Sequence, residues 1–90
     1  MAKNSPDNPI DTLRAKIDSL DLELLKLLNQ RARLATEIGD AKKIEQSDFH
    51  VPSREQKIYQ QLEQHNQGPL PNQAVRHIFR EIISASLALE

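Results

Sequence analysis

Apolar residues recur along the first half of the chain at alternating intervals of four and three. Eight of the nine positions in this stripe are apolar: Leu13, Ile17, Leu20, Leu24, Leu27, Arg31, Leu34, Ile38 and Ala41. This spacing is a heptad repeat, which returns to one side of an α-helix. A second stripe runs beside it through Leu25, Leu28, Ala32, Ala35 and Gly39. With Asp11 or Thr12 as N-cap, the pattern predicts a long helix over about residues 11–45.

Two shorter helices are expected after the connector QSDFHVP. Pro52 suits the first turn of a helix that runs on through residues 53–67, and Gly68 followed by Pro69 is a stop signal. Pro71 or Asn72 then begins a third helix, which we expect to continue to the last residue. Its apolar face is broad and consists of Val75, Ile78, Phe79, Ile82, Ile83, Ser86, Leu87 and Leu89. The fold class predicted is all-α, with three helices per protomer.

The length of the first helix predicts a homodimer. About 35 residues at 1.5 Å each span about 52 Å, whereas a compact domain of this size has a diameter of roughly 30 Å. The two shorter helices cannot cover both apolar stripes, which would leave a large exposed apolar patch. Pairing the long helices of two chains, in an intertwined dimer, removes that patch.

Composition narrows the classes of function. The 90 residues allow one domain, with a polar leader over 1–9 that we expect to be disordered and a folded domain over 10–90. The absence of cysteine excludes disulfides and thiol chemistry. A net charge of −1 and three aromatic residues argue against a nucleic-acid partner. No apolar run is long enough for a membrane span or a signal peptide, so we expect a cytosolic protein.

One charged residue, Arg31, interrupts the apolar stripe of the first helix, and two other cations are related to it by their spacing. Arg31 occupies one of the nine positions of the first apolar stripe, which we call the seam. A guanidinium that is buried there needs a partner. One interpretation is a register-setting residue paired with a glutamate of the other chain, and the other is an internal anion site. Lys42 lies about 16 Å along and 20° around the same helix, so both side chains can lean toward one point. Arg14, about 25 Å from Arg31, could reach that point only from the partner of an antiparallel dimer.

Four further residues are candidates, each with a plain structural alternative. Arg54 and Glu55 open the second helix, where a solvated pair is the alternative. Ser86 and Glu90 share one face of the third helix, where the hydroxyl could bond its own i−4 carbonyl. Together the set suggests cations converging with one carboxylic acid, without a nucleophile–base pair or metal spacing. Such a site would bind a small dianion and act by orientation and electrostatics.

Three stretches of the chain resemble the all-helical chorismate mutases of the AroQ class. They are LRAKIDSLDLELLKLLNQRARLATEIGDAK, PSREQKI, and GPL followed by VRHIFREIISASLALE. The resemblance covers residues 10–90 and is greatest to the N-terminal mutase portion of bifunctional chorismate mutase–prephenate dehydratases. It implies an intertwined homodimer of three-helix protomers that converts chorismate to prephenate without metal or cofactor, in phenylalanine and tyrosine biosynthesis.

The resemblance also implies roles for the cationic residues. Arg14 corresponds to the arginine donated across the dimer to the other subunit's substrate. Arg31 corresponds to the arginine that binds a substrate carboxylate from within its own chain. Lys42 corresponds to the lysine that contacts a carboxylate and the ether oxygen, and Arg54 to an arginine lining the pocket.

The remaining correspondences concern hydrogen-bonding groups. Glu55 corresponds to the glutamate that binds the substrate hydroxyl, Ser86 to a small polar residue of the third helix, and Glu90 to the Gln or Glu that faces the ether oxygen. Val51 stands where some members carry an aspartate, so only its backbone could contact substrate. Because relatives continue beyond the position of Glu90, we expect a domain excised from a longer protein, with a dehydratase domain following, or else a free-standing mutase.

Two alternatives stay open at this point. An isochorismate–pyruvate lyase shares this fold and cationic pocket, and a comparison of the two substrates distinguishes it. A non-catalytic helical dimerisation module predicts that Arg31 pairs only with protein carboxylates. Binding to DNA through a basic helix is disfavoured, because acidic residues are interspersed among the arginines.

Overall fold

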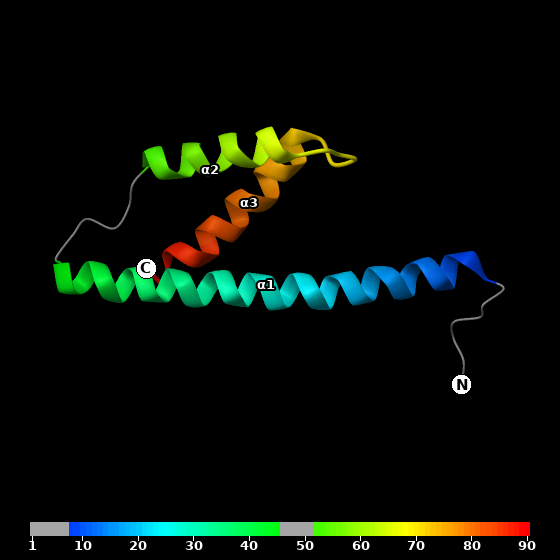
Figure 1. The fold of residues 1–90 in the computed structure, drawn as a ribbon, viewed down its shortest axis with the longest axis horizontal. Helices are drawn as coiled ribbons and strands as arrows, with labels where there is room; N and C mark the ends of the chain where they lie inside the picture. The colour runs from blue at the N-terminus through cyan, green and yellow to red at the C-terminus, as the bar shows by residue number, and fades with distance from the viewer. Residues whose placement is uncertain (1–7, 46–51) are drawn as a thin grey trace. The chain divides into compact units, whose positions relative to one another are not determined.

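A computed structural model describes residues 8–45 and 52–90 and shows three helices (Figure 1). Helix α1 is Pro9–Glu45, α2 is Pro52–His65 and α3 is Asn72–Leu87. These described residues contain no β-strand. The prediction of an all-α chain with one long and two shorter helices is therefore confirmed. Nowhere in residues 8–45 or 52–90 does a helix combine the length and the apolar character needed to span a lipid bilayer.

Helix α1 begins two residues earlier than the sequence analysis predicted. The side chain of Asn8, not of Asp11 or Thr12, caps it: Asn8 Oδ1 accepts hydrogen bonds from the backbone N–H of Ile10 at 3.0 Å and of Asp11 at 3.3 Å. Pro9 occupies the first helical position, where the missing N–H costs nothing. The Asn8–Pro9 pair, which the sequence analysis assigned to the leader, is thus the start signal of the helix.

The chain divides into two compact units, one up to Arg31 and the other Ala32–Glu90. In the first unit, none of residues 8–31 is buried in the single chain. The apolar seam side chains of this unit have exposed fractions between 54% and 62%; they are Leu13, Ile17, Leu20, Leu24 and Leu27. The described residues of this unit are stabilised by the backbone hydrogen bonds of the helix and by the Asn8 cap.

The second unit contains the core. The buried residues come from all three helices: Ala35 from α1, Tyr59 from α2, and Ile83 and Ser86 from α3. Ile83 belongs to the apolar face that the sequence predicted for the third helix, which explains why this face is turned inward. The core is small, so each of these buried side chains matters for the stability of the unit.

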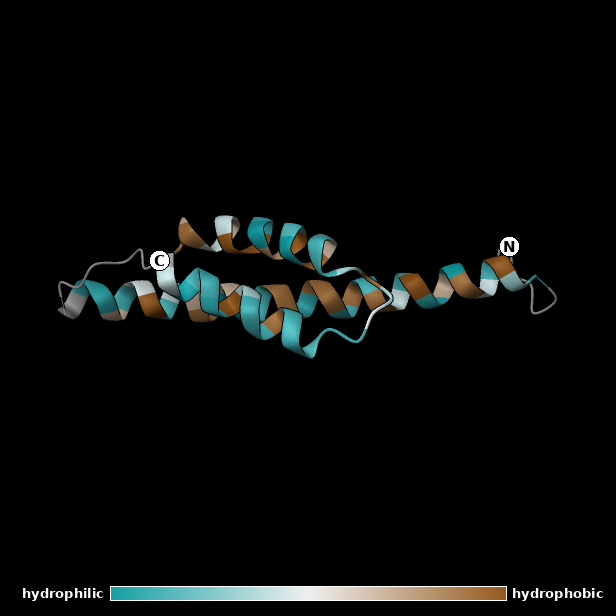
Figure 2. Cartoon of the chain, turned by 90° about the horizontal axis from the view of Figure 1, so that it is seen from above, coloured by the Kyte–Doolittle hydropathy of each residue, from teal (hydrophilic) through white to brown (hydrophobic). Residues whose placement is uncertain are grey.

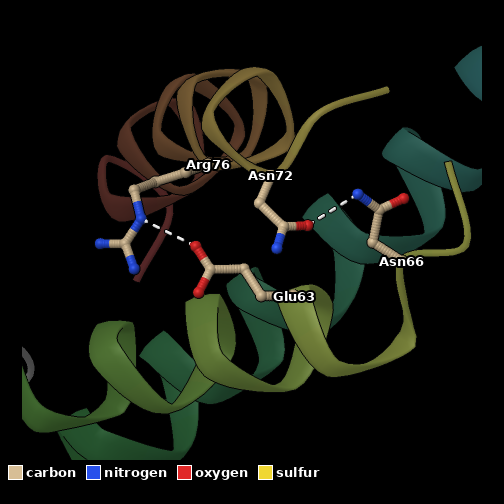
Figure 3. A network of polar contacts seen from close by, with 4 residues as sticks. All are labelled: Glu63, Asn66, Asn72 and Arg76. Atoms are coloured by element: carbon tan, nitrogen blue, oxygen red, sulfur yellow. Dashed lines mark hydrogen bonds and ion pairs between the residues drawn. The ribbon is translucent and has the colours of Figure 1, made fainter. Parts of the chain in front are cut away.

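Helices α2 and α3 are joined by polar contacts as well (Figure 3). Arg76 on α3 donates a hydrogen bond from Nε to Oε2 of Glu63 on α2, at 3.1 Å. Its guanidinium carbon also lies 4.7 Å from the centre of the Tyr59 ring, a distance suited to a cation–π contact. One arginine therefore contacts both a charge and an aromatic ring of the neighbouring helix.

The side chain of Asn66 forms hydrogen bonds across the segment between α2 and α3. Its Nδ2 donates to the carbonyl of Leu70 at 2.8 Å. The same Nδ2 donates to Oδ1 of Asn72 at 2.7 Å (Figure 3). Its Oδ1 accepts from the N–H of Gly68, at 3.0 Å. The residue that was predicted to lie within the second helix thus links the ends of both helices. Gly68 has a φ of 75°, a conformation that glycine adopts readily, and the Gly68–Pro69 bond is cis.

Helix α3 ends at Leu87, so the prediction that it continues to the last residue is wrong. The N–H of Leu89 donates to the carbonyl of Ser86 at 2.9 Å, and that of Glu90 to the carbonyl of Leu87 at 3.3 Å. Such bonds to the third preceding carbonyl tighten the chain relative to an α-helix. Leu89 and Glu90 therefore leave the helix in a turn.

Candidate active site

Lys42 and Glu90 meet in the second unit, although 48 residues separate them in the sequence. Lys42 lies in the last turn of α1, and Glu90 follows the turn at the end of α3. The Lys42 Nζ and Glu90 Oε1 atoms are 3.8 Å apart, and the side chains are 20% and 21% exposed. The structure thus brings together the two residues that the sequence analysis assigned to the substrate's ether oxygen, a cation and a carboxylic acid.

Ser86 lies in the last turn of α3 and is buried. Its Oγ donates a hydrogen bond of 2.9 Å to the carbonyl of Ile82, four residues earlier. This is the structural interpretation that the sequence analysis set beside a substrate contact. The bond satisfies a buried hydroxyl on an otherwise apolar helix face.

The other two cations predicted for α1 lie in the first unit. Arg31 is half-buried and Arg14 is exposed. They are 17 residues apart on one continuous helix, which corresponds to about 25 Å. Arg14 and Arg31 of one chain therefore lie far apart, and this separation is what the sequence analysis expected.

Arg54 and Glu55 lie in the first turn of α2. Arg54 is exposed and Glu55 is half-buried. A carboxylate in this position is favoured by the positive end of the helix dipole, so Glu55 also stabilises the start of α2. Val51, the remaining predicted site residue, lies outside the described residues.

Gly39 is a residue that the sequence analysis did not assign to the site. It is buried on α1, one turn before Lys42, and the backbone of Leu89 and Glu90 lies directly against it. From the sequence it is only a poor helix former in the second apolar stripe. The available signal was a glycine at i−3 from a candidate lysine, which places both on one helix face.

The chemistry available at this site is that of charges and hydrogen-bond donors. A lysine ammonium and a carboxyl group that can carry a proton are both donors to an oxygen on which negative charge develops. Within residues 8–45 and 52–90, no three His, Asp or Glu side chains gather in a way that would hold a metal ion. The arrangement suits a reaction that needs orientation and charge stabilisation.

Curated relatives of this chain are chorismate mutases. It is 46% identical over 82 residues to a bifunctional chorismate mutase/prephenate dehydratase of Aquifex aeolicus, a match that covers 87% of this chain and 23% of that protein. It is 41% identical over 58 residues to an intracellular chorismate mutase of Mycobacterium tuberculosis, covering 64% of this chain and 55% of that one. The chain therefore spans about a quarter of the length of the bifunctional relatives it matches.

Solved structures with the same fold are also chorismate mutases. The enzyme of Thermus thermophilus (form II) aligns with a TM-score of 0.89 at 36% identity, over 91% of this chain and 93% of that one. The enzyme of Helicobacter pylori, solved in complex with prephenate, aligns with a TM-score of 0.81 at 32% identity, over 89% and 87%. The family model described as chorismate mutase type II matches residues 13–90. On this evidence the chain belongs to the chorismate mutase type II family.

Proposed function

We propose that this chain catalyses the rearrangement of chorismate to prephenate. The observation that carries the proposal is the Lys42–Glu90 pair, because it provides a cation and a carboxylic acid at one point of a family fold. The similarity to a Helicobacter pylori enzyme solved with prephenate supports the same substrate class. The reaction is unimolecular, so it requires no nucleophile, only the correct conformer of the substrate and stabilisation of its developing charge.

The arginines hold the two carboxylates of chorismate in this proposal. A guanidinium binds a carboxylate through two parallel hydrogen bonds, which fixes its orientation as well as its position. Arg31 binds one carboxylate from its own chain and Arg14 of the partner subunit binds the other, while Arg54 lines the pocket. Holding both ends of the molecule selects the folded conformer in which the reacting carbons approach each other.

Lys42 and Glu90 act where the bond breaks. As the carbon–oxygen bond lengthens, negative charge develops on the ether oxygen, and two donors aimed at that atom stabilise the transition state more than the substrate. Lys42 donates as an ammonium, and Glu90 donates as a protonated carboxylic acid. Glu55, half-buried at the start of α2, accepts the hydrogen bond of the substrate hydroxyl.

A homodimer completes the site. The seam residues of α1 that are more than half exposed in the single chain form an apolar stripe, visible as recurring brown segments along α1 (Figure 2). Burying one such side chain contributes about 1.5–3 kcal/mol, so the stripe as a whole favours pairing with a second copy of α1. In an antiparallel pair, the start of one α1 approaches the middle of the other, which brings Arg14 of the partner subunit toward Arg31.

The direct test is a chromatographic assay of chorismate consumption and prephenate formation by the purified chain. We expect saturable turnover, lost by about 100-fold or more in Arg31→Ala because an Arg–carboxylate contact is removed. Arg33→Ala is the matched control, since Arg33 is exposed on the same helix. Absence of turnover in a folded dimer would contradict the proposal, and release of pyruvate from isochorismate instead would assign the lyase activity.

The donation of Arg14 across the dimer has its own test. Arg14→Ala and Arg31→Ala chains are each expected to be inactive alone. Mixed in equal amounts and allowed to exchange subunits, they form heterodimers in which one of the two sites has both arginines. About a quarter of the wild-type activity should return, since half of the dimers are mixed and half of their sites are intact. No recovery after proven exchange would contradict the donation of Arg14.

A further inference from the structure

Gly39 permits an approach between α1 and residues 89–90 that no other residue would allow. A Cβ atom built on Gly39 would lie 2.7 Å from the carbonyl oxygen of Leu89. It would also lie 2.8 Å from the Cα and carbonyl carbon of Glu90, where favourable carbon–carbon separations are about 3.5–4.0 Å. All three atoms belong to the backbone, so rotation of a side chain cannot relieve the overlap.

Leu89 and Glu90 are not free to shift alone. Their N–H groups donate to the carbonyls of Ser86 and Leu87 at 2.9 and 3.3 Å, so the turn is tied to the end of α3. Ser86 is itself buried and bonded to Ile82. A side chain at position 39 would therefore move the turn as a unit, away from the surface of α1.

That movement would separate the groups of the candidate site. Gly39 and Lys42 are three residues apart and share one face of α1, so the turn that lies on Gly39 presents Glu90 to Lys42. The Nζ–Oε1 distance is already 3.8 Å, and a further displacement would place the carboxyl group beyond direct contact. A misplacement of about 1 Å in a catalytic group can cost about 100-fold in rate.

We propose that Gly39 is a positioning residue for the rearrangement: by letting the backbone of Leu89 and Glu90 lie on α1, it sets the Glu90 carboxyl group beside Lys42. This inference rests on the proposed mutase function and adds a residue that touches neither substrate nor reacting atoms. The competing explanation is that Gly39 has no positioning role and is only a residue that the helix can accommodate. Under that explanation, replacement by alanine would raise the midpoint of thermal unfolding, because alanine is the better helix former.

The test compares Gly39→Ala with Gly68→Ala, the substitution of the only other glycine in the sequence. Gly68 has a positive φ and nothing within 4 Å of a Cβ built on it, so its replacement strains the backbone without moving the site. We expect kcat of Gly39→Ala to fall by about 100-fold, with KM nearly unchanged, because the arginines that bind the carboxylates stay in place. Gly68→Ala should keep the wild-type kcat.

Two readouts separate positioning from a general loss of structure. One readout is the separation of kcat from KM, since displacement of Glu90 lowers kcat while the binding of the substrate carboxylates, reflected in KM, is unchanged. Combined with Glu90→Ala, Gly39→Ala should cause no further loss of kcat, since the group it displaces is already absent. Multiplicative losses of kcat, or a rise of KM in Gly39→Ala as large as the fall of kcat, would overturn the inference.

A second variant covers the case in which Gly39→Ala does not fold. In a chain that ends at Ala88, the atoms that meet the new Cβ are gone, and Gly39→Ala should raise the midpoint of thermal unfolding instead of lowering it. A lower midpoint in both chains would overturn the inference. Absence of mutase activity in the wild-type chain would refute the proposed function, whereas an active wild type with an impaired Glu90→Ala and an unimpaired Gly39→Ala would refute only the role of Gly39.

Discussion

The two units of the chain use one continuous helix in opposite ways. Up to Arg31, the described part of α1 buries none of its residues and displays a row of leucine and isoleucine side chains. From Ala32 onward, the same helix contributes the small residues Ala35 and Gly39 to a packed interior. Large side chains suit an interface that a second chain fills, and small ones suit close approach by a neighbouring segment of the same chain.

The residues of the proposed site are distributed over both units. Arg14 and Arg31 belong to the unit with the exposed seam, whereas Lys42 and Glu90 belong to the unit with its own core. In the proposed mechanism, the fold of one chain places the two donors for the ether oxygen, whereas the second carboxylate-binding arginine comes from a partner subunit. Substitutions in the two units should therefore fail in distinguishable ways.

The largest effect is expected from the seam. Leu20→Asp together with Leu24→Asp removes about 2 kcal/mol of apolar burial per side chain and places carboxylates in an interface where each unpaired charge costs several kcal/mol more. Sedimentation velocity should show monomers, and mutase activity should be lost with the partner subunit's Arg14. Leu22→Asp, between the two positions but outside the heptad seam, is the control. Equal dissociation by Leu22→Asp would show that the seam is not the interface.

The next effect sharpens the comparison within the second unit. Lys42→Ala should lower kcat by about 100- to 1000-fold, the usual cost of removing one donor to a developing negative charge. The dimer should persist, because Lys42 is outside the seam of large apolar residues. Lys43→Ala provides the match, as Lys43 is the exposed neighbour in the same last turn of α1. Retention of kcat in Lys42→Ala would remove this residue from the mechanism.

The smallest effect concerns stability alone. Arg76→Ala removes an ion pair whose side chains are 43% and 28% exposed, together with the contact on Tyr59. Because exposed pairs are weak, we expect a loss of about 1 kcal/mol in the free energy of unfolding. Urea titration at fixed protomer concentration measures it, with Arg80→Ala, one turn later on α3, as control. A large loss of kcat in folded Arg76→Ala would contradict this prediction, because it would show that the Arg76 contacts affect catalysis as well as stability.

Local signals explain what could be predicted about the fold. The heptad stripe predicts α1 because the spacing of apolar residues alone defines a helix face. Pro52 marks the start of α2 for the same kind of local reason. Two of the boundaries that were wrong depended on side-chain contacts: Asn8 caps α1 from within the predicted leader, and Asn66 forms hydrogen bonds just after the end of α2. An asparagine in a polar stretch has many alternatives, so its role is visible only once the helix is in place.

The candidate site was only partly predictable. Arg31 was identified because it interrupts an apolar stripe, the other cations by their spacing or their place at a helix start, and the resemblance to a family then assigned them roles. Gly39 carries no such signal, since a glycine in a helix is read as a cost in stability. Its contact with the backbone of Leu89 and Glu90 depends on where α3 ends, and the sequence analysis extended that helix too far.

The sequence by itself determined the all-α class, the long first helix, the unsatisfied apolar seam and the set of charged candidates. These follow from periodicity, helix length and the cost of burying charge, which are properties of residues close together in the chain. Only the tertiary structure decided that Glu90 lies beside Lys42 and that the backbone of Leu89 and Glu90 lies against Gly39. The physical reason is that contacts between distant segments depend on the packing of whole helices, to which every side chain between them contributes.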